Sequence, residues 1–208
     1  MSPSPLHQTV ATDLRAAYDG SAEARSSSER APWQLQERDA FLARLQYEGR
    51  RSLFEVGAGA GHDSRYFADN GLTVLATDLS PQMVAMCQRR GLEAHVMDVL
   101  HLELPAGAFE AAYAMNSLLH VPNSDLADAL AAIRRPLKSG ALFYLGLYGG
   151  PEPFEGVLSS DRHIPPRFFS FRTDSQLLAQ VEPLFAVEDF HIIEDDGYFQ
   201  ALTLRALA

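Results

Sequence analysis

The stretch at residues 55–63, EVGAGAGHD, has the residue types and spacing best suited to bind a ligand. Its three glycines, Gly57, Gly59 and Gly61, permit a tight turn and let a ligand approach the main chain. An apolar segment precedes the stretch, and residues 63–68 after it favour a helix. Because a helix N-terminus offers unpaired N–H groups and a positive dipole end, this loop suits a carboxylate or a phosphate.

Asp78 stands 21 residues after Gly57, at the end of a second apolar segment, residues 72–77. An acidic residue at that distance from a glycine loop typically accepts hydrogen bonds from ribose hydroxyls. The glycines do not follow the dinucleotide pattern G-x-G-x-x-G, because position 62 is His62, and the sequence has no G-x-x-x-x-G-K-[ST] phosphate loop. The combination predicts a ligand with a ribose and disfavours an NAD-linked oxidoreductase.

Apolar and helical segments alternate from residue 52 onward, which is typical of parallel βαβ units in a doubly wound α/β sheet. The expected parallel strands are residues 52–56, 72–77, 93–97, 109–115 and 141–148. The expected helices between them are residues 63–68, 81–90 and 124–135, the last two capped by Ser80 and Asn123.

The C-terminal part differs from this alternation. Residues 149–172 contain four prolines and are predicted to be a long connection. Thr173 and Gln176 form a capping box for a helix that ends before Pro183. Residues 186–193 and 199–204 indicate two strands joined at residues 195–197 (DDG), so that the sheet is expected to have seven strands and to end in an antiparallel hairpin.

The N-terminal part is the least regular. Residues 11–18 favour a short helix, and residues 33–45 a second one. Between them, residues 21–31 (SAEARSSSERA) are small and polar and are predicted to be mobile.

Several of these segments, taken in order, resemble the class I S-adenosylmethionine-dependent methyltransferases, and the resemblance covers residues 50–206. The glycine loop resembles the first motif of that family, residues 78–80 (DLS) the second, and residues 97–99 (MDV) the third. The fourth strand and the turn into the fifth are matched by residues 109–116 (FEAAYAMN) and 137–142 (LKSGAL). Residues 118–122 and 167–170 resemble a bacterial subgroup that acts on small molecules.

The resemblance implies that the ligand is S-adenosylmethionine, which becomes S-adenosylhomocysteine when it loses its methyl group. It places Asp78 on the ribose and Asp98 at the adenine amino group. Glu55 stands where many members have Asp and is expected to position the loop all the same. The residues implied in cofactor binding are Tyr18, Glu55, Gly57, Ala58, Gly59, Gly61, Asp63, Asp78, Leu79, Met83, Met97, Asp98, Val99 and Asn116.

His120 is the candidate catalytic residue, because it follows the fourth strand, close to where the transferable methyl group is expected. A neutral imidazole there is suited to remove a proton from an attacking oxygen or nitrogen. The alternative is that His120 hydrogen-bonds a backbone group and shapes the turn at residues 121–122. A third possibility is an acceptor that is already ionised, such as a carboxylate, for which Arg167 or Arg172 would serve as an anchor.

The acceptor is expected to bind between residues 1–48, a helical lid, and the connection at 149–172, with residues 49–208 forming the cofactor-binding domain. Trp33 is also compatible with plain helix packing, and Asp63 with a role at a helix N-terminus. The candidate acceptor-binding residues are Trp33, Tyr148, His163, Arg167 and Phe169.

Composition excludes several other classes of protein. The chain has 208 residues, which suits one domain, and a net charge of −10, which disfavours nucleic acid as a partner. It has a single cysteine, Cys87, so no intramolecular disulfide forms, in keeping with a reducing cytoplasm. No signal peptide, membrane-spanning segment or metal-ligand pattern is visible in the sequence, so we expect a cytoplasmic, metal-independent monomer or homodimer.

These observations together predict methyl transfer from S-adenosylmethionine to a small organic acceptor by direct in-line displacement. The target atom is expected to be oxygen or nitrogen, with carbon less favoured. The rival hypothesis is a protein that binds the cofactor without methylating anything and serves an accessory or rearrangement role.

Overall fold

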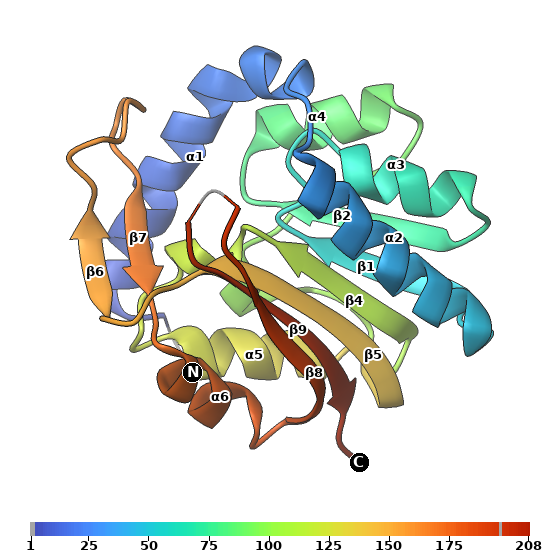
Figure 1. Ribbon diagram of the computed structural model, residues 1–208. Coiled ribbons are helices and arrows are strands. Elements are labelled where there is room, and N and C mark those ends of the chain that lie inside the picture. The colour runs from blue at the N-terminus through green and yellow to red at the C-terminus, as the bar shows by residue number, and fades with distance from the viewer. Residues whose placement is uncertain (1–2, 196) are drawn as a thin grey trace.

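The computed structural model describes residues 3–195 and 197–208, which form one seven-stranded sheet with helices on both faces and a small separate hairpin (Figure 1). The strand order is β3-β2-β1-β4-β5-β9-β8. The predicted doubly wound, mostly parallel α/β fold is therefore confirmed. No helix within the described residues is long and apolar enough to cross a membrane.

The five parallel strands lie where the sequence predicts them, within a few residues. They are β1 (Ser52–Val56), β2 (Thr73–Asp78), β3 (Glu93–Val96), β4 (Phe109–Met115) and β5 (Leu137–Tyr148). The last two strands, β8 (Phe185–Ile193) and β9 (Phe199–Ala206), pair antiparallel to each other, and β9 pairs antiparallel to β5. The hairpin is confirmed, although Asp196 in its predicted turn lies outside the described residues.

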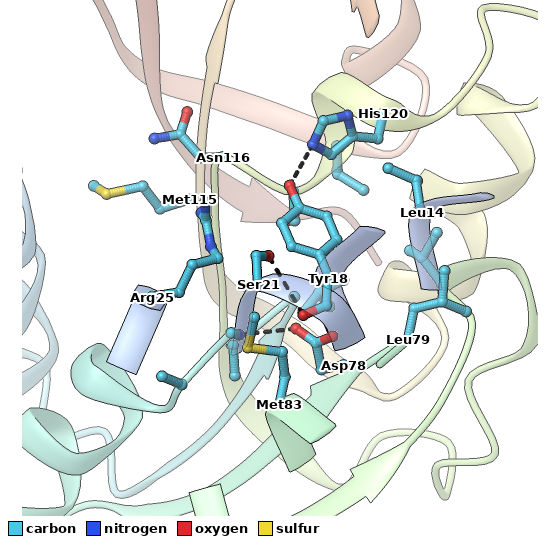
Figure 2. Close-up of a pocket in the computed structure, with 18 of the residues that line it drawn as sticks. Leu14, Tyr18, Ser21, Arg25, Asp78, Leu79, Met83, Met115, Asn116 and His120 are labelled. Carbon is cyan, nitrogen blue, oxygen red and sulfur yellow. Dashed lines mark hydrogen bonds between the residues drawn. The ribbon is translucent and has the colours of Figure 1, made fainter. Parts of the chain in front are cut away.

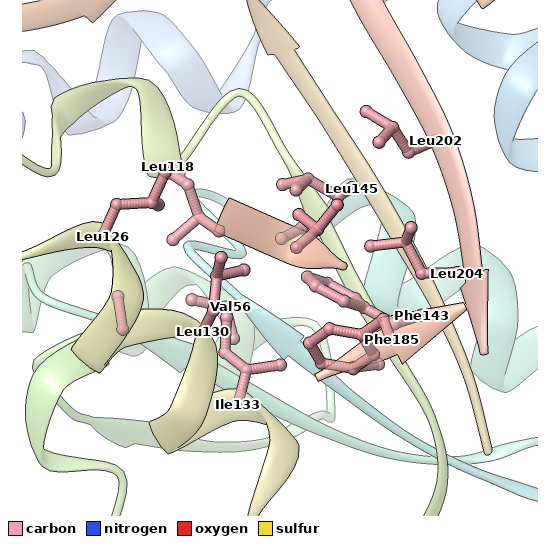
Figure 3. Close-up of a cluster of buried hydrophobic side chains, with 14 of the residues drawn as sticks. Val56, Leu118, Leu126, Leu130, Ile133, Phe143, Leu145, Phe185, Leu202 and Leu204 are labelled. Carbon is pink, nitrogen blue, oxygen red and sulfur yellow. The ribbon is translucent and has the colours of Figure 1, made fainter. Parts of the chain in front are cut away.

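Two sets of helices cover the sheet. On one face, α2 (Pro32–Tyr47), α3 (His62–Asp69) and α4 (Pro81–Arg89) pack against β1, β2 and β4. On the other, α5 (Leu126–Arg134) and α6 (Asp174–Val181) pack on a cluster of buried side chains from β1, β4, β5 and β9 (Figure 3). The cluster includes Phe143, which is fully buried with its ring 5.4 Å from that of Phe185. These two layers hold the carboxyl ends of the parallel strands in fixed positions.

The first helix is longer than predicted. α1 runs from Pro5 to Ser26 and so includes residues 21–26 of the segment 21–31, which the sequence predicts to be mobile. Ser4 caps its N-terminus by accepting from the His7 N–H, and Pro5 occupies the first helical position. The sequence did not indicate this part of the helix, because residues 21–26 are mostly polar and at least partly exposed. Among these six residues only Ala22 is buried, next to Met83 and Met86 of α4.

The connection after β5 also contains structure that the sequence did not predict. β6 (Phe154–Val157) and β7 (Phe168–Phe171) form a two-stranded antiparallel sheet beside α1 (Figure 1). Short 3₁₀ helices, η1 (Val99–His101) and η2 (Leu118–His120), follow β3 and β4. α5 begins at Leu126 rather than directly after Asn123, and Asp125 occupies its cap position.

Candidate active site

A cavity of about 530 Å³ opens at the carboxyl ends of β1, β2 and β4 and is covered by α1 (Figure 2). This volume is typical of a small-molecule site. Of the predicted site residues, those in its wall are Tyr18, Gly57, Ala58, Gly59, Asp78, Leu79, Met83, Met97, Asp98, Val99, Asn116, His120 and His163. The fold thus brings together segments that the sequence separates by more than a hundred positions.

The glycines of the loop have different roles. Gly57 has φ 71°, and a Cβ there would lie 2.4 Å from the Cβ of Ser117, so only glycine fits against the end of β4. At Gly61 a Cβ would lie 2.8 Å from the Sγ of Cys87, so this glycine permits close packing on α4. Gly59 has φ 56°, but a Cβ there would meet nothing within 4 Å. Because Gly59 lines the cavity, it leaves room for a ligand to lie against the backbone.

Asp78 holds this loop in place from the end of β2. Its Oδ2 accepts from the Gly59 N–H and its Oδ1 from the Ser80 N–H, both at 2.8 Å. Burial raises the pKa of Asp78, and the two backbone hydrogen bonds oppose that shift. Since a carboxylate oxygen accepts more than one hydrogen bond, the carboxylate retains capacity for hydroxyl groups in the cavity.

Asp98 has a partner that the sequence analysis missed. Nε2 of His7, on α1, lies 2.9 and 3.0 Å from the two carboxylate oxygens, and the Leu100 N–H donates to Oδ1 at 2.9 Å. Burial disfavours the charged carboxylate, but these hydrogen bonds outweigh it, so the pKa of Asp98 lies below its usual range. No local pattern could have identified His7, because 91 positions separate it from Asp98.

Two polar atoms in the cavity wall lack a protein partner. Asn116 Oδ1 and Ser117 Oγ are buried and make no hydrogen bond to any described residue. Asn116 also has φ 58°, a left-handed conformation that is uncommon outside glycine and turns the chain sharply after β4. Buried polar groups are normally hydrogen-bonded, so these two atoms suit a ligand that carries hydrogen-bond donors.

His120 lies in the cavity wall with both ring nitrogens engaged. Nδ1 is 2.6 Å from the carbonyl oxygen of Phe168, which only accepts, so Nδ1 carries the proton. Nε2 therefore has a lone pair, and the Tyr18 hydroxyl donates to it at 2.7 Å (Figure 2). Burial lowers the pKa of His120 to about 4, although the Phe168 carbonyl acts in the opposite direction. The ring is consequently neutral at neutral pH.

Arg167 contacts the other side of the Tyr18 hydroxyl. Its Nη1 donates to the Tyr18 oxygen at 3.3 Å, while its Nη2 donates to Asp161 at 2.8 Å. Burial opposes ionisation of Asp161, but hydrogen bonds from Arg167 and His163 hold its pKa well below the usual range. The positive charge of Arg167 is thus balanced within the site.

Arg25 is a second residue that the sequence analysis missed. It lines the cavity on the same side as Met115 and Asn116, and its guanidinium lies 5.1 Å from the centre of the Tyr18 ring (Figure 2). No hydrogen bond or ion pair joins this guanidinium to another described residue. It is therefore a cation available to an anionic group of a ligand.

Comparison with known proteins identifies a methyltransferase domain within the chain. Residues 54–145 match the family model described as a methyltransferase domain. The chain is 27% identical over 190 residues to the malonyl-[acyl-carrier protein] O-methyltransferase of Pseudescherichia vulneris, covering 88% of this chain and 75% of that protein. It is 34% identical over 114 residues to the ubiquinone biosynthesis O-methyltransferase of Xanthomonas oryzae, covering 51% of this chain and 46% of that protein.

The solved structures agree on the fold. The 1,6-didemethyltoxoflavin-N1-methyltransferase of Burkholderia thailandensis, solved with bound S-adenosylhomocysteine, superposes with a TM-score of 0.76 at 19% identity. The alignment covers 100% of this chain and 92% of that one. Residues 54–145 form a methyltransferase domain, and the fold is that of the class I S-adenosylmethionine-dependent methyltransferases. Its cofactor is S-adenosylmethionine, and the open space at Gly59 and the unpartnered oxygens of Asn116 and Ser117 fit such a ligand.

Three predicted cofactor residues of the methyltransferase lie behind the loop rather than in the cavity wall. Glu55 is buried and accepts from the Ser64 hydroxyl; burial and the nearby charge of Asp63 raise its pKa. Asp63 pairs with Arg30 at 2.8 Å and does not reach the cavity. Together with Gly61, these residues support the glycine loop from the side that faces away from the cavity.

Of the five predicted acceptor-binding residues, His163 lies in the cavity wall, and the other four lie outside it: Trp33, Tyr148, Arg167 and Phe169. The rings of Trp33 on α2 and Tyr148 on β5 pack on Phe199, with centroids 4.6 and 5.3 Å away. Phe169 is buried behind His120, 4.9 Å from its ring.

Arg172 is also not available as an anchor for an acceptor. It is 1% exposed and donates to the carbonyl oxygens of Val121 at 2.6 Å and Ser170 at 3.0 Å. Burial lowers its pKa to about 10. Arg172 therefore holds the chain after η2 against β7.

No three His, Cys, Asp or Glu side chains gather into a metal-binding group anywhere in residues 3–195 and 197–208. The only cysteine, Cys87, is buried and donates to the Gly59 carbonyl oxygen.

Replacing Asp78 with alanine is expected to weaken the binding of S-adenosylhomocysteine by about 10- to 150-fold, equivalent to about 1.5–3 kcal/mol. The loss arises because the carboxylate both offers acceptors to the cavity and holds the Gly59 N–H. Isothermal titration calorimetry measures the change. Asp69→Ala is the control, since that carboxylate is exposed at the end of α3 and pairs with Arg65, away from the cavity. Equal affinities for Asp78→Ala and wild type would remove Asp78 from the site.

Proposed function

We propose that this methyltransferase methylates an oxygen or nitrogen atom of a small organic acceptor. The observation that carries the proposal is that one cavity extends from the glycine loop, through Asn116, to the Tyr18–His120 pair. The acceptor would bind at that end, between α1 and the loop that carries His163 and Arg167. Of the residues expected at the acceptor, His163 lines the cavity. Arg167 would act through its hydrogen bond to the hydroxyl of Tyr18, which also lines the cavity.

The cofactor would be held at the other end of the cavity. Asp78 would accept from its ribose, and Asp98 and the Val99 N–H would contact its adenine, between Leu79, Met83 and Met97. Asn116 Oδ1 and Ser117 Oγ would meet its methionine part. When bound, S-adenosylmethionine supplies a methyl group on a sulfonium sulfur, which is a good leaving group without further activation.

The main task of the protein is then to align the reactants and to exclude water. α1 is fixed over the cavity at three points along its length. The Ser4 N–H and hydroxyl donate to Asp125 at 3.0 and 2.7 Å, His7 contacts Asp98, and Tyr18 donates to His120. A helix held in this way closes the site without any covalent step.

The comparisons favour oxygen as the target atom, because both curated relatives described above are named O-methyltransferases. The second of them is matched over less than half of its own length, so its acceptor does not transfer to this chain. The rings of Tyr18, His120 and His163 at the acceptor end of the cavity suit an aromatic compound.

The test is incubation of the protein with S-adenosylmethionine labelled in its methyl group and a deproteinised bacterial extract, in the presence of a chelator. We expect a labelled small molecule to form at the same rate with and without the chelator. If the cofactor is bound but no label leaves it, the rival hypothesis of binding without methylation holds. A rate that collapses in chelator and returns with magnesium would contradict the expected metal independence.

Arg25→Gln is expected to weaken the binding of S-adenosylhomocysteine by about tenfold, because its guanidinium would pair with the cofactor's carboxylate. Binding of 5′-methylthioadenosine, which has no carboxylate, should be unchanged, and calorimetry with both ligands makes the comparison. Arg15→Gln, an exposed substitution on the same helix outside the cavity wall, is the control. Equal losses for the two ligands would show that Arg25 acts through folding.

A further inference from the structure

We propose that Tyr18 is a catalytic residue that relays the acceptor's proton to His120. The proposal rests on the proposed function, since only an acceptor that loses a proton on methylation needs such a relay. It differs from the original expectation for His120, because Nε2, the one ring nitrogen of His120 with a free lone pair, already accepts from the Tyr18 hydroxyl. The hydroxyl of Tyr18, not the imidazole, would contact the reacting atom.

The hydrogen bonds around Tyr18 fix the direction of the relay. The Phe168 carbonyl keeps the proton of His120 on Nδ1, so Nε2 accepts from Tyr18. The Tyr18 oxygen also accepts from Arg167 Nη1 at 3.3 Å. A phenol oxygen has two lone pairs, so one remains, and it can only accept. A ligand in the cavity therefore meets Tyr18 with an O–H or N–H group.

The proton transfer balances within these groups. As the acceptor atom gains the methyl group, its bond to hydrogen breaks and that proton moves to the Tyr18 oxygen. The Tyr18 proton moves to Nε2 of His120, which becomes an imidazolium and keeps its Nδ1 hydrogen bond to Phe168. The electron pair of the broken carbon–sulfur bond stays on sulfur.

A weak base is sufficient for this transfer. An oxygen or nitrogen that is being methylated becomes strongly acidic as the new bond forms, so a neutral imidazole of low pKa can still receive the proton. Arg167 stabilises negative charge on the Tyr18 oxygen during the transfer, and its own charge is balanced by Asp161. The titratable and charged groups that face the His120–Tyr18 pair are Arg25 on α1 and Asp161, His163 and Arg167 in the loop before β7.

The first test compares Tyr18→Phe with the wild type in the labelled-methyl assay on the deproteinised extract. We expect the rate to fall by about 100-fold or more, with the affinity for S-adenosylhomocysteine within twofold of the wild type. The product label should survive mild alkali, because ethers and methylamines are stable there while methyl esters are not. Tyr198→Phe is the matched control, since it also removes a hydrogen-bonded hydroxyl, here to Asp174 at 2.8 Å, outside the cavity wall.

His120→Asn should lower the rate as much as Tyr18→Phe, and the double variant should fall no further, because the two groups act as one unit. The wild-type rate should stay level as pH falls to about 5.5 and decline toward the pKa of His120, about 4. The rate falls at low pH because only the neutral form of His120 can accept the Tyr18 proton. A decline centred near pH 6.5, the ordinary range of histidine, would contradict the relay.

Nitrogen-15 NMR of histidine-labelled protein bound to S-adenosylhomocysteine gives a readout without turnover. We expect His120 as the Nδ1–H tautomer, with Tyr18→Phe shifting only the Nε2 signal. Three results would overturn the relay but not the proposed function. They are normal turnover by Tyr18→Phe, a product label that mild alkali removes, and a loss of cofactor affinity in Tyr18→Phe as large as its loss of rate. A wild type that transfers no label at all overturns the proposed function together with the relay.

Discussion

Replacing Gly59 with valine is expected to weaken the binding of S-adenosylhomocysteine by about 100-fold or more, equivalent to about 2.7 kcal/mol. Gly59 lines the cavity, and a Cβ there would meet no protein atom within 4 Å, so a valine side chain would occupy the space left for the ligand. The backbone at φ 56° also disfavours a β-branched residue and would shift the N–H that donates to Asp78. Calorimetry measures the affinity.

The control for this prediction is Gly71→Val, which separates backbone strain from loss of the site. Gly71 also has a positive φ, 89°, with nothing within 4 Å of its Cβ position, but it follows α3 outside the cavity wall. Each substitution should cost about 1–2 kcal/mol of unfolding free energy, or roughly 2–8 °C in melting temperature. Only Gly59→Val should lose the ligand, and equal affinities for the two variants would show that Gly59 does not face the cofactor.

Replacing Phe143 with alanine is expected to lower the free energy of unfolding by about 3–5 kcal/mol, a large share of the about 5–15 kcal/mol typical of a domain. Phe143 is fully buried at the centre of the cluster under α5 and α6, where its ring packs on Phe185 (Figure 3). Removal of the ring leaves a cavity that the surrounding strands cannot close. Urea unfolding followed by circular dichroism measures the loss.

Phe154→Ala is the matched control, because Phe154 on β6 is 37% exposed and its truncation should cost only about 1 kcal/mol or less. The Phe143 variant should still bind S-adenosylhomocysteine at low temperature, since Phe143 lies in the core and not in the cavity wall. A stability equal to that of the wild type would show that this cluster is not the principal core.

The local sequence was sufficient to predict the sheet and the glycine loop that follows its first strand. Apolar runs bounded by glycine, proline and capping residues predicted the strands, because these signals act within a few residues of one another. β1 and β4 were predicted with the observed bounds, and the capping box at Thr173 begins α6. The glycine loop and Asp78 were also predictable, since their spacing follows from one βαβ unit.

The tertiary structure alone decided which residues line the Tyr18–His120 end of the cavity. Trp33 and Tyr148 have residue types suited to an acceptor pocket, yet packing on Phe199 removes both from the cavity. α1 extended beyond its predicted end because its last turns pack on α4, a contact that polar composition does not reveal.

The hydrogen-bond partners of the predicted residues could likewise not be predicted from the sequence. Tyr18 meets His120 across 102 positions of the chain, and His7 meets Asp98 across 91. The low pKa of His120 arises from burial between α1 and β7, and so only the folded chain determines it. Residue types and short spacings therefore determined the glycine loop and the acidic residue after it, whereas long-range packing decided which groups meet at the Tyr18–His120 end of the cavity, because no local interaction encodes that juxtaposition.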